Sequence, residues 1–294
     1  MEPSSEIDAK QTALESELRS AGRVLVAFSG GVDSSYLAFA ASRLLGDDAL
    51  AVTALSASYP QAHRAMAEKV SADFQIAHRL VSTHELDVAE YRANAPDRCY
   101  HCKTELFDVL GALRDELGFD AVAYGINTDD TGDFRPGHRA ADEHGVLSPF
   151  LSAGLGKSEI RALSRRAGLP TADLPASACL SSRLPYGTSV TPERLRQVEQ
   201  GEERLRALGY RQVRLRHHGA MARVEIAPEE LASALDPVRA QAIVEAIKPL
   251  GFRWVSLDLE GYRTGSLNEV LTITNDSFDG VRDGSSGSRG RETR

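Results

Sequence analysis

The residues best suited to chemistry lie at positions 29–35, which read Ser-Gly-Gly-Val-Asp-Ser-Ser and directly follow the apolar run 24–28. Glycine adopts positive φ angles at little cost, so this turn can bring bare backbone N–H groups close to an anion. A helix that starts behind the turn adds free amides and hydroxyls, and its dipole favours negative charge there. The pattern predicts a phosphate cradle formed by Ser29, Gly30, Gly31, Asp33, Ser34 and Ser35.

Asp33 is unusual among these groups, because a carboxylate repels phosphate unless a cation such as Mg2+ bridges the two. A second polar run, Gly-Ile-Asn-Thr-Asp-Asp at 125–130, follows a predicted strand and could hold Mg2+ or a ribose, although alone it would be an ordinary turn. Lys157 begins a predicted helix and is a candidate phosphate partner, with helix capping as the alternative. We therefore add Gly125, Asn127 and Lys157 to the predicted nucleotide site, with Asp33 and Asp130 as magnesium ligands.

Other phosphate-binding loops fit this sequence poorly. No Gly-x-Gly-x-x-Gly string stands between a predicted strand and helix, and the Gly-Lys-Ser at 156–158 has Leu151 where a Walker A loop needs glycine. An ordinary serine-capped turn is the remaining alternative. The run at 29–35 resembles the signature of the PP-loop (N-type) ATP pyrophosphatases, which split ATP into AMP and pyrophosphate.

Three cysteines form a second candidate site. Cys99 and Cys102 are spaced Cys-x-x-Cys between a polar loop and a predicted helix, and Cys179 lies in the polar segment 176–183. Three thiolates suit a 4Fe–4S cluster with one iron left free. A redox pair, a zinc site completed by His101, and three unconnected thiols remain open.

The elements that must position these residues alternate between strand-like and helix-like patterns, which predicts an α/β fold with a doubly wound, mostly parallel sheet. Strands are expected at Val24–Phe28, Leu50–Leu55, Ile76–Val81 and Ala121–Tyr124. Helices are expected at Ile7–Arg19, Asp33–Leu45, Pro60–Ala72, His101–Leu117 and Lys157–Ala167. Ligands of such folds bind at the carboxyl ends of the strands, where the 29–35 turn would lie.

A polar stretch from Leu169 to Thr191 interrupts this alternation, and a smaller α+β pattern follows it. Helices are expected there at Pro192–Leu208 and Pro237–Ile247, and strands at Gln212–Arg216, Ala222–Ile226 and Phe252–Leu257. We predict a nucleotide domain at 1–189, a smaller substrate or oligomerisation domain at 190–273, and a disordered tail at 274–294. Strand alternation places Arg214 and Arg216 on one face, where they could grip phosphate or carboxylate; a solvated strand face is the alternative.

The composition limits the function classes. The 294 residues are 42% hydrophobic and 26% charged, as in globular proteins, and no apolar run approaches the length of a membrane span. The net charge of −8 argues against nucleic-acid binding, which favours a basic face. An odd number of cysteines and the lack of a signal-peptide pattern favour the reducing cytoplasm.

Over residues 5–270 the chain resembles the LarE family of ATP-dependent sulfur transferases, which act in synthesis of the nickel-pincer nucleotide cofactor. The resemblance rests on the 29–35 turn, Cys-Tyr-His-Cys-Lys at 99–103, the 125–130 run, Ala-Cys-Leu-Ser-Ser-Arg at 178–183, and the segments 214–219 and 223–226. It implies that ATP and Mg2+ adenylate a carboxylate of a pyridinium dicarboxylate mononucleotide. A sulfur nucleophile then displaces AMP and leaves a thiocarboxylate.

The resemblance also implies roles for individual residues. The catalytic residues would be Cys179, Asp33, Lys103 and Arg183, and the substrate would contact Arg214, Arg216, Arg223 and Glu225. In one branch of the family the cysteine that matches Cys179 gives up its own sulfur, but that branch lacks the Cys-x-x-Cys pair. This chain resembles the other branch, in which Cys99, Cys102 and Cys179 would hold a 4Fe–4S cluster that carries sulfide. We also expect a homo-oligomer, a sulfide source and a nickel-inserting partner protein.

Three rival functions stay open. A PP-loop tRNA thiolase can also carry three cluster cysteines, although the acidic balance argues against it. A PP-loop amidotransferase or synthetase would pass ammonia to an adenylate and need no cysteines. A nucleotide-sensing regulator would bind ATP without releasing pyrophosphate.

Overall fold

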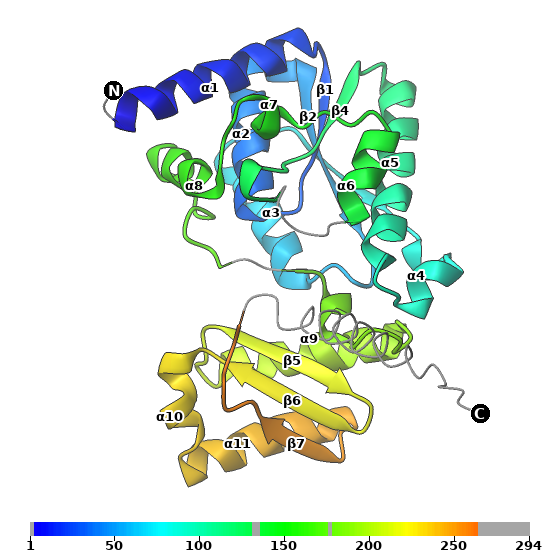
Figure 1. Ribbon diagram of the computed structural model, residues 1–294, viewed down its shortest axis with the longest axis vertical. Helices are drawn as coiled ribbons and strands as arrows, with labels where there is room; N and C mark the ends of the chain where they lie inside the picture. The colour runs from blue at the N-terminus through cyan, green and yellow to red at the C-terminus, as the bar shows by residue number, and fades with distance from the viewer. Residues whose placement is uncertain (1–2, 131–135, 176–177, 264–294) are drawn as a thin grey trace, which may run out of the picture.

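The computed structural model describes residues 3–130, 136–175 and 178–263, and it contains two sheets, each with its own helices (Figure 1). The strands of the first sheet are β1 (Val24–Ala27), β2 (Ala49–Leu55), β3 (His78–Ser82) and β4 (Ala121–Ala123). Its helices are α1 (Pro3–Ser20), α2 (Val32–Leu45), α3 (Gln61–Asp73), α4 (Ala89–Ala93), α5 (Arg98–Leu117), α6 (Pro136–Glu143), α7 (Pro149–Ser152) and α8 (Lys157–Arg166). No described helix is long and apolar enough to cross a lipid bilayer.

The four strands are parallel and lie in the order β3-β2-β1-β4. Val24 of β1 is in register with Ala49 of β2 on one side and with Ala121 of β4 on the other. β1 is therefore central, and its carboxyl end lies beside that of β4. This arrangement places the 29–35 turn next to the 125–130 run.

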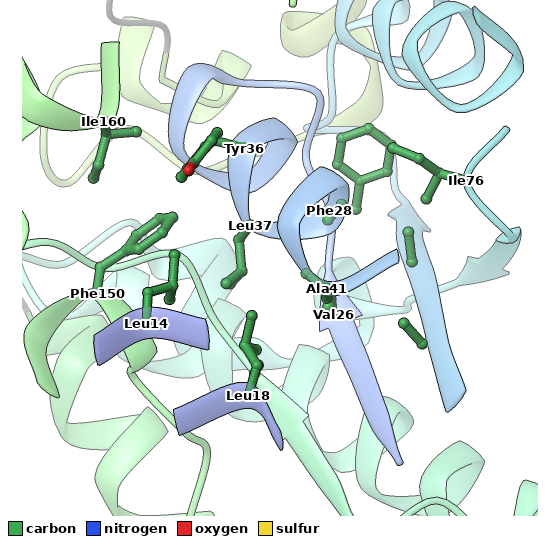
Figure 2. Packing of buried hydrophobic residues seen from close by; sticks show 14 of the residues in the cluster. Leu14, Leu18, Val26, Phe28, Tyr36, Leu37, Ala41, Ile76, Phe150 and Ile160 are labelled. Atoms are coloured by element: carbon green, nitrogen blue, oxygen red, sulfur yellow. The ribbon is translucent and has the colours of Figure 1, made fainter. Parts of the chain in front are cut away.

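Helices cover both faces of this sheet. The side chains of β1 are apolar on both sides, so both sides are buried against helices. Val24 and Val26 pack into a cluster with α1, α2, α7 and α8, part of which is drawn in Figure 2. Leu25 and Ala27 point the other way, toward Phe107 of α5 and the alanines of α6. Strands buried on both faces are expected to read as continuous apolar runs. The predicted doubly wound α/β fold is confirmed.

The second sheet has the order β5-β6-β7, with β5 (Val213–His218) antiparallel to β6 (Met221–Ile226) and β7 (Trp254–Leu257) parallel to β6. Helices α9 (Pro192–Ala207), α10 (Leu231–Ala234) and α11 (Pro237–Ile247) accompany it. Its core also takes Tyr91, Leu180 and Leu184 from the preceding part of the chain. The domain boundary at 189/190 stays a prediction, and the predicted tail at 274–294 lies outside the described residues.

The main difference from the predicted elements is the start of α5. The helix begins at Arg98 rather than His101, so Cys99 lies within its first turn instead of before it, in the same helix as Cys102. Backbone bonds from Arg98 to Ala95 and from Tyr100 to Asp97 lead directly into the helix. The polar residues before His101 are typical of a loop. Arg98 is nevertheless buried, and its tertiary contacts stabilise the earlier helix start.

Candidate functional site

The turn after β1 depends on Gly30, which has φ = +71°. A Cβ atom at this position would lie 2.6 Å from the backbone oxygen of His63 and 3.1 Å from the backbone nitrogen of Ala67. Both the backbone angle and the close approach of α3 therefore require glycine. Gly31 differs, because it is extended at φ = −81° and a Cβ there would meet only Ser29 Oγ, at 3.5 Å.

The serines of the turn have different roles. The Ser34 hydroxyl accepts from the backbone N–H of Ser29 at 3.1 Å and lies 3.0 Å from Ser29 Oγ, so it stabilises the turn itself. Ser35 Oγ is buried and has no hydrogen-bond partner in the described part of the chain. From the loop after β2, the Tyr59 hydroxyl donates to the backbone oxygen of Ser29 at 3.0 Å. Among the hydroxyls of this turn, that of Ser35 is the one left without a hydrogen-bond partner within the described residues.

Asp33 and Lys157 meet at the amino end of α2, where one Asp33 oxygen, Oδ2, accepts from the Lys157 ammonium. The other oxygen, Oδ1, is buried without a partner among the described residues. Burial raises the pKa of the Asp33 carboxyl, Lys157 partly offsets this, and the negative charge of Asp130 raises it further. A buried carboxylate oxygen without a donor is a ready ligand for a cation.

The 125–130 run lies against the same helix end. A Cβ on Gly125 would approach the backbone nitrogen of Ser34 to 3.2 Å, so glycine permits this contact. The buried Asn127 side chain accepts from the backbone N–H of Asp129 at 3.0 Å, and Asp129 in turn accepts from the backbone N–H of Lys157 at 2.6 Å. The structure therefore brings together all of the residues predicted to bind nucleotide and magnesium.

The donor set at this edge fits Mg2+. Magnesium in phosphate sites typically takes one or two carboxylates, with phosphate oxygens and water completing its octahedron. Asp33 and Asp130 are close enough for the charge of Asp130 to raise the pKa of Asp33, and they are the two carboxylates that could bind the ion. Across the described residues, no group of three His, Cys, Asp or Glu side chains is arranged to hold a metal ion by itself.

The three cysteines also converge, although they lie on two segments. Cys99 is exposed on α5, while Cys102 and Cys179 are half-buried. Burial raises the pKa of the Cys102 thiol, and the charges of Cys179 and Glu85 raise it further. The donor chemistry of three neighbouring thiols suits a cluster, whereas their arrangement forms no metal site.

Two predicted catalytic cations flank these cysteines. The Lys103 ammonium lies 4.4 Å from the centre of the Tyr124 ring, one residue before Gly125. Arg183 is buried in an ion pair with Glu202 of α9 at 2.8 Å, and it donates to the backbone oxygen of Cys179 at 3.0 Å. Arg183 thus ties the Cys179 turn to the second sheet.

The predicted substrate residues lie on β5 and β6 and are already engaged with one another. Arg216 forms two hydrogen bonds of 2.9 Å to Glu225 and donates to the backbone oxygen of Ser182 at 2.8 Å. Arg223 approaches the same carboxylate at 3.0 Å. Arg214 and Arg216 are buried, so the alternative of a solvated strand face was wrong. Burial and the nearby Arg183 lower the pKa of Arg214 to about 10.

Sequence reasoning missed several residues that shape the site. Arg98 and Tyr91 contact the turn that follows Cys179, Tyr59 contacts the phosphate turn, and Glu202 holds Arg183. Arg98 directly precedes Cys99, and that adjacency was the one available signal. The others became visible only once distant segments were placed side by side.

Comparison with known proteins agrees with this geometry. The asparagine synthase family matches residues 8–110, which carry the phosphate turn. The chain is 44% identical over 250 residues to an uncharacterized protein of Synechocystis sp., covering 85% of this chain and 93% of that protein. It is 34% identical over 268 residues to the pyridinium-3,5-bisthiocarboxylic acid mononucleotide synthase of Lactiplantibacillus plantarum, covering 90% of this chain and 95% of the synthase. An uncharacterized protein of Methanocaldococcus jannaschii is 27% identical over 82% of this chain and 91% of its own length. The chain belongs to the LarE family of PP-loop proteins.

Proposed function

We propose that this protein is an ATP-dependent sulfur transferase, which adenylates a carboxylate of a pyridinium dicarboxylate mononucleotide and converts it to a thiocarboxylate. One observation carries the proposal. The turn at residues 29–35 and the turn that begins at Cys179 are both bonded to one short segment, the consecutive residues Ser58 and Tyr59. The backbone oxygen of Ser58 accepts from the N–H of Leu180 at 2.9 Å, and the hydroxyl of Tyr59 donates to Ser29. ATP activation and sulfur delivery would therefore occur in one site.

In the first step, a substrate carboxylate oxygen attacks the α-phosphorus of ATP, and the bond to pyrophosphate breaks. Negative charge builds on the departing pyrophosphate, where the free amides at the start of α2 and the Lys157 ammonium would stabilise it. Asp33 and Asp130 would hold Mg2+, which neutralises phosphate charge when bound. In the second step, a sulfur nucleophile attacks the acyl carbon and AMP leaves.

The substrate would lie between the cysteine turn and the second sheet. Arg216 donates to the backbone of Ser182, three residues after Cys179, so the arginines of β5 reach the turn that carries this sulfur. A pyridinium dicarboxylate mononucleotide carries carboxylates and a phosphate, which planar guanidinium groups recognise well. Buried arginines in a chain with a net charge of −8 support an anionic substrate.

For the sulfur source, we propose a 4Fe–4S cluster held by Cys99, Cys102 and Cys179. When bound, such a cluster would supply sulfide on its free iron. The Cys-x-x-Cys spacing of Cys99 and Cys102 on α5, and the electrostatic influence of Cys179 and Cys99 on the Cys102 thiol, support this proposal. The second candidate is Cys179 itself as a sacrificial donor, since its turn bonds to Ser58, the residue before Tyr59, and is linked to α9 through Arg183 and Glu202.

Purification without oxygen tests the sulfur source. We expect brown protein with iron and labile sulfide each near about four per chain. Iron-free protein that loses the mass of one hydrogen sulfide on turnover would instead assign the sulfur to Cys179. Co-purifying tRNA, seen by ultraviolet absorbance, would favour the thiolase rival.

Pyrophosphate release tests the reaction class separately. With ATP, Mg2+ and the pyridinium dicarboxylate mononucleotide, we expect pyrophosphate release that Cys179→Ala leaves intact, because adenylation precedes sulfur transfer. Thiocarboxylate formation should be lost in the same variant. No pyrophosphate release in wild type would contradict the proposal. Full thiocarboxylate formation by Cys179→Ala would contradict the assigned role of the cysteine.

A further inference from the structure

Arg98 links the two segments that carry the cysteines. It is 3% exposed at the start of α5 and directly precedes Cys99. Its Nη1 donates to Asn94 Oδ1 at 2.5 Å and to the backbone oxygen of Ser181 at 2.9 Å, and its Nη2 lies 3.9 Å from Cys99 Sγ. Ser181 lies two residues after Cys179, so one side chain contacts both cysteine-bearing segments.

Among the described residues, the Arg98 guanidinium has no carboxylate partner, which a buried cation normally has. Buried arginines are almost always paired with a carboxylate, because desolvating an unpaired charge is costly. Within the described ranges, no carboxylate forms an ion pair with Arg98, and its hydrogen-bond acceptors are an amide, a backbone carbonyl and a thiol.

Further hydrogen bonds join the same two segments around Arg98. Asn94, in the left-handed conformation at φ = +55°, donates through Nδ2 to the backbone oxygens of Pro185 at 2.8 Å and Thr188 at 2.9 Å. Tyr91 contributes a hydroxyl contact of 2.6 Å to Ser181 Oγ. Of these side chains, only that of Arg98 contacts a cysteine sulfur within the described residues. The spacing between Cys99 and Cys179 therefore depends on it most directly.

We propose that Arg98 is a positioning residue that holds the Cys179 turn beside Cys99 and provides the positive charge that the sulfur groups there require. This inference rests on the proposed function, which assigns sulfur delivery to the cysteines. It holds equally for a cluster ligand set and for Cys179 as the donor, because both need this turn to be fixed beside α5. It adds a residue whose hydrogen bonds, within the described part of the chain, go to Asn94, Ser181 and Cys99 rather than to the phosphate turn or to the strands of the second sheet.

Crosslinking of the reduced, metal-free, full-length protein tests the spacing. A short bifunctional thiol-alkylating reagent should join Cys99 to Cys179 in wild type, as detected by peptide mass mapping. Arg98→Gln should crosslink these cysteines about tenfold more slowly or worse, because hydrogen bonds from a charged donor are lost. Arg98→Lys should fall between the two, since lysine keeps the charge but cannot reach both acceptors with a planar fork. Arg114→Gln, which removes a guanidinium paired with Asp115 on the same helix, should match wild type.

Two further measurements separate positioning from general damage. Crosslinking rates are divided by the rates with a monofunctional reagent, which corrects for altered thiol reactivity, and far-UV circular dichroism checks the fold. If Arg98→Gln does not fold, Arg98→Lys at an unchanged melting temperature carries the test. A folded Arg98 variant with the wild-type normalised rate would overturn the proposal, as would a wild type that forms no such crosslink. The assay uses no ATP, iron or pyridinium substrate, so its failure is distinct from failure of the proposed reaction.

Discussion

Substitution by alanine should have different effects at the two neighbouring glycines of the phosphate turn. It should lower the stability of the fold at Gly30 and the affinity for nucleotide at Gly31. In Gly30→Ala the new methyl lies 2.6 Å from the His63 backbone oxygen, and φ stays at +71°. The left-handed conformation costs about 1–2 kcal/mol for a residue with a Cβ. Displacing the α3 backbone adds roughly 1–3 kcal/mol, as for other overpacked sites. The free energy of unfolding should therefore fall by about 2–5 kcal/mol.

Gly31→Ala introduces the same methyl at an extended residue, with ordinary contact to Ser29 Oγ at 3.5 Å. Its effect on the free energy of unfolding should be about 1 kcal/mol or less, which reflects the poorer helix cap. The methyl would lie at the start of α2, in contact with Ser29 Oγ among the described atoms, where the nucleotide phosphates would bind. We expect the affinity for Mg–ATP to fall at least about tenfold, which corresponds to about 1.4 kcal/mol.

Thermal unfolding by far-UV circular dichroism and titration calorimetry with a non-hydrolysable ATP analogue measure the two effects. Gly30→Ala should lower the melting temperature by at least about 4 °C. Gly31→Ala should melt near wild type and bind nucleotide weakly. Equal melting temperatures for the two variants would refute the argument from the α3 contact. If Gly31→Ala bound the ATP analogue as tightly as wild type, the prediction that nucleotide phosphates bind at this turn would be refuted.

Two other substitutions test the buried charges. Burial raises the pKa of Asp33 above its value in the unfolded chain, so its ionisation costs stability; the cost is absent below the unfolded pKa and complete above the folded pKa. Without nucleotide, Asp33→Asn should therefore melt at a higher temperature than wild type at pH 7 and at the same temperature at low pH. The variant should also lose Mg-dependent ATP binding. A lower melting temperature than wild type at pH 7 would contradict this reasoning. Glu202→Gln should destabilise the protein by about 3–5 kcal/mol in urea unfolding, since Arg183 would remain buried without its carboxylate. The exposed neighbour Glu203→Gln should have little effect, and equal losses in the two would argue against the buried pair.

Much of the first sheet could be predicted because its signals are local. An apolar run buried on both faces marks β1, and the polar turn behind it follows within a few residues. The order of strands and helices then predicts a parallel sheet, and so places residues 29–35 and 125–130 at one edge. β1 and β4 pair in parallel, as predicted, and their register, which was not predicted, fixes that proximity.

The cysteine region could be predicted only in part. The spacing of Cys99 and Cys102 indicated a ligand pair, but the earlier start of α5, which takes Cys99 into the helix, depends on the burial of Arg98 against Asn94 and Ser181. Contacts across more than 80 residues of sequence leave no periodic trace in either segment. The short helices α4, α6, α7 and α10 were missed because they contain too few turns for a helical pattern to be visible.

The sequence by itself determined the chemistry of the phosphate turn, the parallel α/β order and the presence of three thiols, because residue type and short spacing encode them. Only the tertiary structure decided which charges are already paired. It couples Arg216 to Glu225 and Arg183 to Glu202, yet it leaves Asp33 Oδ1 without a hydrogen-bond partner and Arg98 without a carboxylate among the described residues. Pairing depends on distances between segments that folding brings together, and burial then sets how much each unpaired charge costs.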